Sequence, residues 1–279
     1  MFIDTFSTHW QHLLDERHER LDNNTQLYLL LDGVFVPDLY RAVQLALGGK
    51  RVSLLFERLP SCSDITRAVS PFLLPYRPAS AQLARALSRC SGWPMVSAIE
   101  TSESIEDVTA RLAAWCVVEN DGQRFNLRYP DTRRLPGLWA ALTPLQRRTL
   151  AGPASSWCYI DRDGTWQALP VPHDPHPIVD RPQLDHQQFA IMVADSEADE
   201  IMSLLRSRGR LPEMKPSQQY ALVHDALRLA KIDQLGIELY PEWCDFFLHK
   251  GLRMDDSAGA VMLVAWRAAE MAALNAFDA

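Results

Sequence analysis

The chain has 279 residues, of which 47% are hydrophobic and 23% are charged, and its formal net charge is −7. This composition is typical of a folded globular protein and argues against extended disorder. No stretch reaches the roughly 18–20 apolar residues that a bilayer span needs, and the first twenty residues lack the pattern of a secretory signal. Five scattered cysteines without a CxxC pair indicate reduced thiols. We therefore expect a cytoplasmic protein.

The first quarter of the chain alternates between predicted strands and helices. Continuous apolar runs at residues 27–31 and 52–56 predict strands that are buried on both faces. Between them, residues 38–47 predict a helix, which ends at two glycines. A second helix at residues 80–89 and a third strand at residues 95–99 follow.

The same alternation continues to about residue 169. A helix is predicted after Ser102 and through Trp115, a strand at 124–129 and a further helix at 135–150, despite Pro144. Residues 158–160 and 166–169 predict a hairpin. Because strands and helices alternate, we expect a mixed α/β lobe with a central sheet and helices on its faces.

A proline-rich segment marks the predicted domain boundary. Residues 170–182 contain five prolines, which disfavour both a helix and a central strand. Beyond them, apolar residues recur at helical spacing, so the rest of the chain is predicted to be all-helical. The fold class is therefore α+β, with an α/β domain at 1–170, a linker at 171–182 and a helical domain at 183–279.

Six arginines and a single acid, Asp131, lie between residues 124 and 148, so this segment carries a net charge of +5 in an acidic chain. It is a candidate nucleic-acid surface, a solvated face or a docking surface for an acidic partner. The overall pI of about 5.6 argues against the nucleic-acid interpretation. The six arginines are Arg124, Arg128, Arg133, Arg134, Arg147 and Arg148.

Two constellations raise the alternative of a small hydrolase. Asp32 follows a predicted buried strand, but no glycine-rich phosphate loop accompanies it, and a turn or capping role is favoured. His173 and His176 flank Asp174 in the proline-rich segment, where no third metal ligand lies nearby in sequence. We therefore predict no catalytic, cofactor-binding or metal-binding residue.

Six short elements between residues 27 and 166 carry a resemblance to a known family through their order and spacing. They read LYLLLDG, SLLFERLP, SPFLLPY, LRYPDTR, AGPASSW and DGTW. In this order they resemble the bacterial type VI secretion effector adaptors, also called Tap or Tec chaperones. The remainder of the chain corresponds to that family's more variable carboxy-terminal part.

The resemblance implies a non-catalytic cytoplasmic adaptor that binds a secreted effector and helps load it onto the valine-glycine-repeat spike protein. It implies no cofactor and no membrane partner. We expect the aromatic helices of the second domain to present a groove to the effector, although such aromatic stripes are also typical of a helical core. The Arg128–Arg134 region is then the candidate second contact face. The candidate partner-binding residues are Arg128, Arg133, Arg134, Trp243, Phe246, Phe247 and Trp266.

Overall fold

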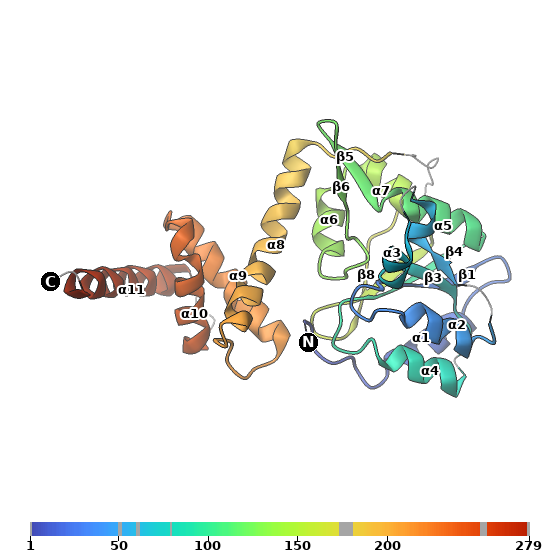
Figure 1. Ribbon diagram of the computed structural model, residues 1–279, viewed down its shortest axis with the longest axis horizontal. Helices are drawn as coiled ribbons and strands as arrows, with labels where there is room; N and C mark the ends of the chain where they lie inside the picture. Colours follow the sequence, from blue (N-terminus) through green and yellow to red (C-terminus); the bar gives the residue numbers. More distant parts are fainter. Residues whose placement is uncertain are drawn as a thin grey trace. The chain divides into compact units, whose positions relative to one another are not determined.

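The computed structural model describes residues 2–49, 52–59, 62–78, 80–172, 181–251 and 256–277 (Figure 1). It divides into two compact units, Met1–Ala194 and Asp195–Ala279. The first unit holds the sheets and the second unit is built from helices, which confirms the α+β fold class.

The first unit is organised around a six-stranded sheet with the order β2-β3-β1-β4-β7-β8. Every neighbouring pair is antiparallel, with Leu29 of β1 lying between Leu74 of β3 and Ala98 of β4. The strands are β1 (Gln26–Leu31), β2 (Ser53–Leu54), β3 (Phe72–Pro75), β4 (Val96–Thr101), β7 (Ser156–Ile160) and β8 (Trp166–Ala168). A separate two-stranded sheet joins β5 (Val117–Asn120) to β6 (Gln123–Asn126).

Helices cover both faces of the six-stranded sheet. Leu27, Leu29 and Leu31 of β1 pack with α1, α2 and α4, whereas Tyr28 and Leu30 pack with α5, α6 and α7. Figure 1 shows α1, α2 and α4 together on one side of the sheet. This explains the continuous apolar run of β1, because a strand buried on both faces has no side exposed to water. The helices are α1 (Trp10–Glu19), α2 (Leu39–Ala46), α3 (Asp64–Ala68), α4 (Ala81–Ser88), α5 (Ile105–Ala114), α6 (Leu135–Ala141) and α7 (Pro144–Ala151).

Two predicted elements differ from the structure for local reasons. The predicted strand at residues 52–56 keeps only Ser53–Leu54 as β2, and the chain then turns into a 3-10 helix at Leu55–Arg58. The predicted helix at residues 135–150 is two helices, because Pro144 lacks the N–H group that a continuous helix needs. Thr143 instead begins α7 with a capping box, and its backbone N–H donates to Gln146 Oε1 at 2.8 Å.

The boundary between the units divides α8 (His186–Ser207), so the second unit begins with the part of this helix from Asp195 onward. It also contains α9 (Pro216–Ile232), α10 (Tyr240–Lys250) and α11 (Asp256–Phe277). Its core is a single cluster centred on Trp243 and Phe247 of α10, which also includes Leu263 and Trp266 of α11. Within the described part of the chain, no helix has both the length and the apolar content needed to cross a bilayer.

The boundary between the two units falls within α8, downstream of the predicted linker. Most of that linker, residues 173–180, lies outside the described residues. Residues 183–194, which we assigned to the helical domain, belong to the first unit. Leu184 donates its backbone N–H to Glu119 O at 2.9 Å and accepts from Asn120 Nδ2 at 2.9 Å. Gln188 Nε2 donates to Ala141 O at 2.9 Å. These bonds attach the start of α8 to β5 and α6.

Candidate functional site

The loop that follows β6 carries part of the basic segment and is firmly fixed to the rest of the first unit. Tyr129 is fully buried, and its hydroxyl donates to Leu112 O on α5 at 2.7 Å. Thr132 donates its backbone N–H to Pro94 O at 3.0 Å. The loop therefore lies against the end of β4 that adjoins Asp32. The backbone from which its arginine side chains extend is held in place by these two hydrogen bonds.

Arg128 pairs with the carboxylate at the end of β1. Its Nη2 atom lies 2.6 Å from Asp32 Oδ2, and the Arg128 side chain is 47% exposed whereas that of Asp32 is 1% exposed. The Asp32 backbone N–H donates to Met95 O at 3.0 Å, which holds the acid beside β4. The guanidinium carbon of Arg128 lies 5.8 Å from the ring centre of Phe35. Asp32 thus holds a half-exposed cation over an aromatic ring.

Arg133, which lies further along the same loop, also contacts the ring of Phe35. Its Nη2 and Nε atoms lie 2.7 and 3.1 Å from the two carboxylate oxygens of Asp131, a bidentate arrangement that fixes the plane of the guanidinium. The guanidinium carbon lies 5.0 Å from the ring centre of Phe2 and 5.8 Å from that of Phe35. Two arginines therefore share one aromatic surface.

The aromatic surface comes from three segments that are distant in sequence. The ring centres of Phe35 and Trp93 are 6.0 Å apart in a stacked arrangement, and those of Phe2 and Trp93 are 5.6 Å apart. All three rings are partly exposed. We name Phe2, Phe35, Trp93, Arg128 and Arg133 the arginine–aromatic cluster.

Gly33 allows the chain to make the turn from Asp32 toward Phe35. A Cβ atom at this position would lie 2.3 Å from the backbone oxygen of Ser70. Only glycine fits so close an approach of two backbone segments. The Asp32–Gly33 pair is therefore a backbone feature that places Phe35, and a larger residue at position 33 would displace the ring.

Burial raises the pKa of the Asp32 carboxyl above its ordinary value, and the nearby Arg128 guanidinium offsets part of this rise. The carboxylate accepts hydrogen bonds from Arg128 and from the backbone N–H of Val34. A charged group kept in an unfavourable, buried position is more typical of a functional region than of a region that serves stability alone. In this protein the buried carboxylate of Asp32 pairs with Arg128 and positions its side chain.

An Asp32→Asn variant is expected to gain stability relative to the wild type as the pH rises. A carboxyl whose pKa is raised by folding binds its proton more tightly in the folded chain, so the wild type loses stability as the pH rises from about 3.9 through the raised pKa. Asparagine has no charge and is free of this loss. Urea unfolding of both proteins at several pH values from about 4 to about 7 measures the difference. A variant that instead lost relative stability with rising pH would show that the attraction of Arg128 outweighs burial.

The other arginines of the basic segment have different surroundings. Arg147 donates from Nε to Trp139 O at 2.7 Å and from Nη2 to Ala140 O at 2.9 Å, so it closes the carboxyl end of α6. Arg134 and Arg148 are half-buried. Arg124 is exposed and borders a groove that is lined by Ala110, Ala113 and Ala114 of α5. At least one arginine of the basic segment, Arg147, thus has a local structural role.

Three of the four aromatic candidates in the helical unit form its core. Trp243 and Phe247 are fully buried and Trp266 is 6% exposed. Trp243 Nε1 also donates to Ala226 O at 2.8 Å. Only Phe246 is partly exposed, with Lys250 Nζ 4.9 Å from its ring centre. These three side chains thus form a packed interior and not the expected aromatic groove. A helical core was the alternative interpretation of this aromatic pattern.

Of the two hydrolase candidates, the structure describes Asp32 but not the histidine pair. His173 and His176 lie outside the described residues. Among the residues with described positions, no group of three or more histidine, cysteine, aspartate or glutamate side chains is placed to hold a metal ion. Asp32 is described, and its carboxylate is engaged by Arg128.

Arg128 and Arg133 were predictable from the charge of their segment, whereas Phe2, Phe35 and Trp93 were not predicted. The latter lie in or beside loops, outside any periodic pattern. A weak signal existed, since Phe35 and Trp93 each lie within two residues of a proline, where an exposed aromatic side chain is held by a rigid turn.

The fold and the cluster together describe an α+β protein that carries a preformed arginine–aromatic surface on its sheet-containing unit. A protein family described as "Domain of unknown function (DUF4123)" matches residues 27–149. The matched stretch includes four members of the cluster, and Phe2 lies before it. No curated protein and no solved structure matches the chain.

Proposed function

We propose that this protein is a non-catalytic adaptor that binds a type VI secretion effector and helps load it onto the valine-glycine-repeat spike protein. The observation that carries the proposal is an overlap. The family match covers residues 27–149, and the ordered elements that resemble the type VI adaptors begin at the same residue and extend to residue 166. The family match and the ordered elements thus fall on the same part of the chain.

The chemistry of the arginine–aromatic cluster supports a binding role. Arginine and aromatic side chains are enriched among the residues that contribute most to protein interfaces. Arg128 is 47% exposed and is already oriented by Asp32, so less side-chain entropy is lost when a partner carboxylate binds. Arg133 is 10% exposed and is paired with Asp131, so it supports the aromatic rings of the cluster. We therefore assign the cluster as a partner-binding surface of the proposed adaptor.

Replacing Phe35 by serine and Arg128 by glutamine together is expected to weaken capture of the partner at least tenfold, because hot-spot residues each contribute about 2 kcal/mol or more. The test is affinity capture, by the purified full chain, of candidate effector and valine-glycine-repeat spike proteins from the same genome. The dissociation constants follow by titration.

The chain offers a matched control for this variant. Tyr40 and Arg41 form another surface aromatic–arginine pair, with the guanidinium carbon 5.6 Å from the ring centre. The Tyr40→Ser/Arg41→Gln variant makes the same chemical change outside the cluster and is expected to retain capture. Equal affinity of the cluster variant and the wild type would remove the cluster from the proposal, and failure of the wild type to bind either protein would contradict the adaptor function itself.

A further inference from the structure

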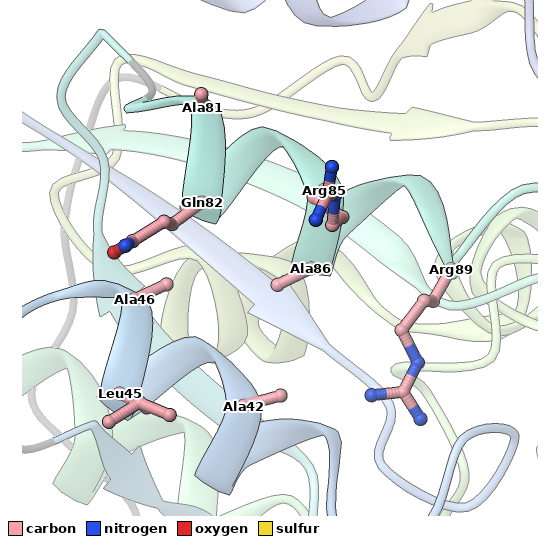
Figure 2. A pocket seen from close by; sticks show the side chains of 8 residues that line it. All are labelled: Ala42, Leu45, Ala46, Ala81, Gln82, Arg85, Ala86 and Arg89. Carbon is pink, nitrogen blue, oxygen red and sulfur yellow. The ribbon is translucent and has the colours of Figure 1, made fainter.

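A groove runs between α2 and α4 on the face of the sheet opposite to α5 (Figure 2). Its volume is about 690 Å³. Alanine and leucine side chains of α2 form one wall, and α4 supplies the other wall and two arginines. The residues that matter for its chemistry are Ala42, Leu45, Ala46, Ala86, Arg85 and Arg89.

The groove exists because both helices direct their large apolar side chains elsewhere. Val43 of α2 and Leu87 of α4 are fully buried against the sheet. The residues left between the two helices are mainly alanines, which are too short to fill the space. Leu45 is 78% exposed at the edge of the groove. Apolar surface therefore remains open to water where two helices already lie side by side.

The arginines give the groove a definite charge. Arg85 lies on α4 and Arg89 is its C-cap residue, one helical turn further on, and both are exposed at the groove (Figure 2). Neither forms an ion pair with any residue that the structure describes. Like charges at this spacing repel each other. The two guanidinium groups are therefore available to carboxylates of a partner, and they favour an acidic partner over a basic one.

The shape and chemistry favour a protein segment over a small molecule. Sites for small ligands place a few convergent polar groups in the interior to fix orientation. This groove has an alanine-rich floor, and its charges lie at the exposed margin.

A helix suits the groove better than an extended peptide. The backbone groups of α2 and α4 are already bonded within each helix, so the walls offer no hydrogen bonds to an extended strand. A partner helix satisfies its own backbone. The eight residues of α2 extend over about 12 Å, which is about two turns of a partner helix.

We propose that the α2–α4 groove binds an amphipathic helix of another protein, with small and branched apolar residues on the buried face and two carboxylates, one turn apart, facing Arg85 and Arg89. This is the helix-in-groove mode of recognition, in which side chains at positions i, i+3, i+4 and i+7 enter the groove. The proposal goes beyond the adaptor function, because it holds whichever protein carries the helix.

The test uses a lactam-bridged peptide helix of about four turns, with leucine and alanine on one face and two glutamates at i and i+4 along its margin. Fluorescence anisotropy measures its binding to the full chain. We expect the Arg85→Glu/Arg89→Glu variant to bind about tenfold more weakly, since two attractive pairs become repulsive. A second peptide with lysines in place of the glutamates is expected to show the reverse preference.

A matched charge change provides the control. Arg58 and Arg124 are exposed arginines beside the separate groove along α5. The Arg58→Glu/Arg124→Glu variant is expected to bind the glutamate peptide as the wild type does. Equal weakening by both double variants would show unspecific attraction and overturn the proposal, as would no detectable binding to the wild type.

A second copy of the chain is the other possible occupant. The mass of the wild type and of a Leu45→Glu variant in solution distinguishes it, and we expect both to have the same mass. A wild-type dimer that the Leu45→Glu change dissociates would overturn the proposal, since the groove would then be an interface between copies.

Discussion

Replacing Arg111 by methionine is expected to lower the free energy of unfolding of the first unit by about 3–5 kcal/mol. Arg111 lies on α5 and is 1% exposed. Its Nε atom donates to Glu103 Oε1 at 2.8 Å, Nη2 contacts the other carboxylate oxygen, and Nη1 contacts Leu150 O on α7. Methionine fills similar space but leaves a largely buried carboxylate and a buried carbonyl without these partners. The loss follows from that uncompensated charge.

Hydrogen exchange of β1 and β4 across a urea series measures this loss, because these strands open only when the first unit unfolds. Arg17→Met is the matched control. Arg17 pairs with Glu100 at 3.1 Å, but its side chain is 31% exposed, so we expect a loss of at most about 1 kcal/mol. If both variants lost the same small amount, the Arg111–Glu103 pair would not be a buried element of the fold.

Replacing Trp243 by alanine is expected to destabilise the helical unit by about 3–5 kcal/mol. The side chain is fully buried, and the ring centres of Phe247 and Trp266 lie 5.5 and 5.4 Å from its own. Truncation leaves a cavity between α10 and α11 and removes the donor to Ala226 O. For a unit of this size the loss is a large part of the total stability.

Hydrogen exchange separates the two units in one experiment. The Trp243→Ala variant is expected to lose protection in α9 and α10 while β1 and β4 stay protected, because the sheet has its own core clusters. Phe246→Ala is the control on the same helix, and its partly exposed ring predicts a smaller loss. Unchanged protection of α9 in Trp243→Ala would contradict the assignment of Trp243 to the core.

The elements of the first unit were predictable wherever one local signal dominated. Residues 27–31 read as a strand buried on both faces, and β1 packs on both sides as that pattern requires. The pairing order of the strands was not predictable, since it depends on contacts between residues distant in sequence. The break between α6 and α7 was visible as Pro144, but the length of the apolar pattern around it suggested one helix.

The candidate site was only half predictable for the same reason. Charge density in the sequence identified Arg128 and Arg133, whereas their partners Asp32, Phe2, Phe35 and Trp93 come from other segments. Sequence charge also could not tell Arg147, which closes a helix end, from Arg128, which is half-exposed. Aromatic spacing in the helical unit was compatible with a groove or a core, and the burial of Trp243 distinguishes them.

A mass measurement on the full chain mixed with a candidate effector and a candidate valine-glycine-repeat spike protein from the same genome tests the proposed adaptor function most directly. We expect light scattering on the co-purified proteins to show one defined complex that contains all three, with the chain present in stoichiometric amount. Binding energy spread over a specific interface produces such a fixed ratio. Separate elution of the chain from both proteins under the same conditions would contradict the proposed function.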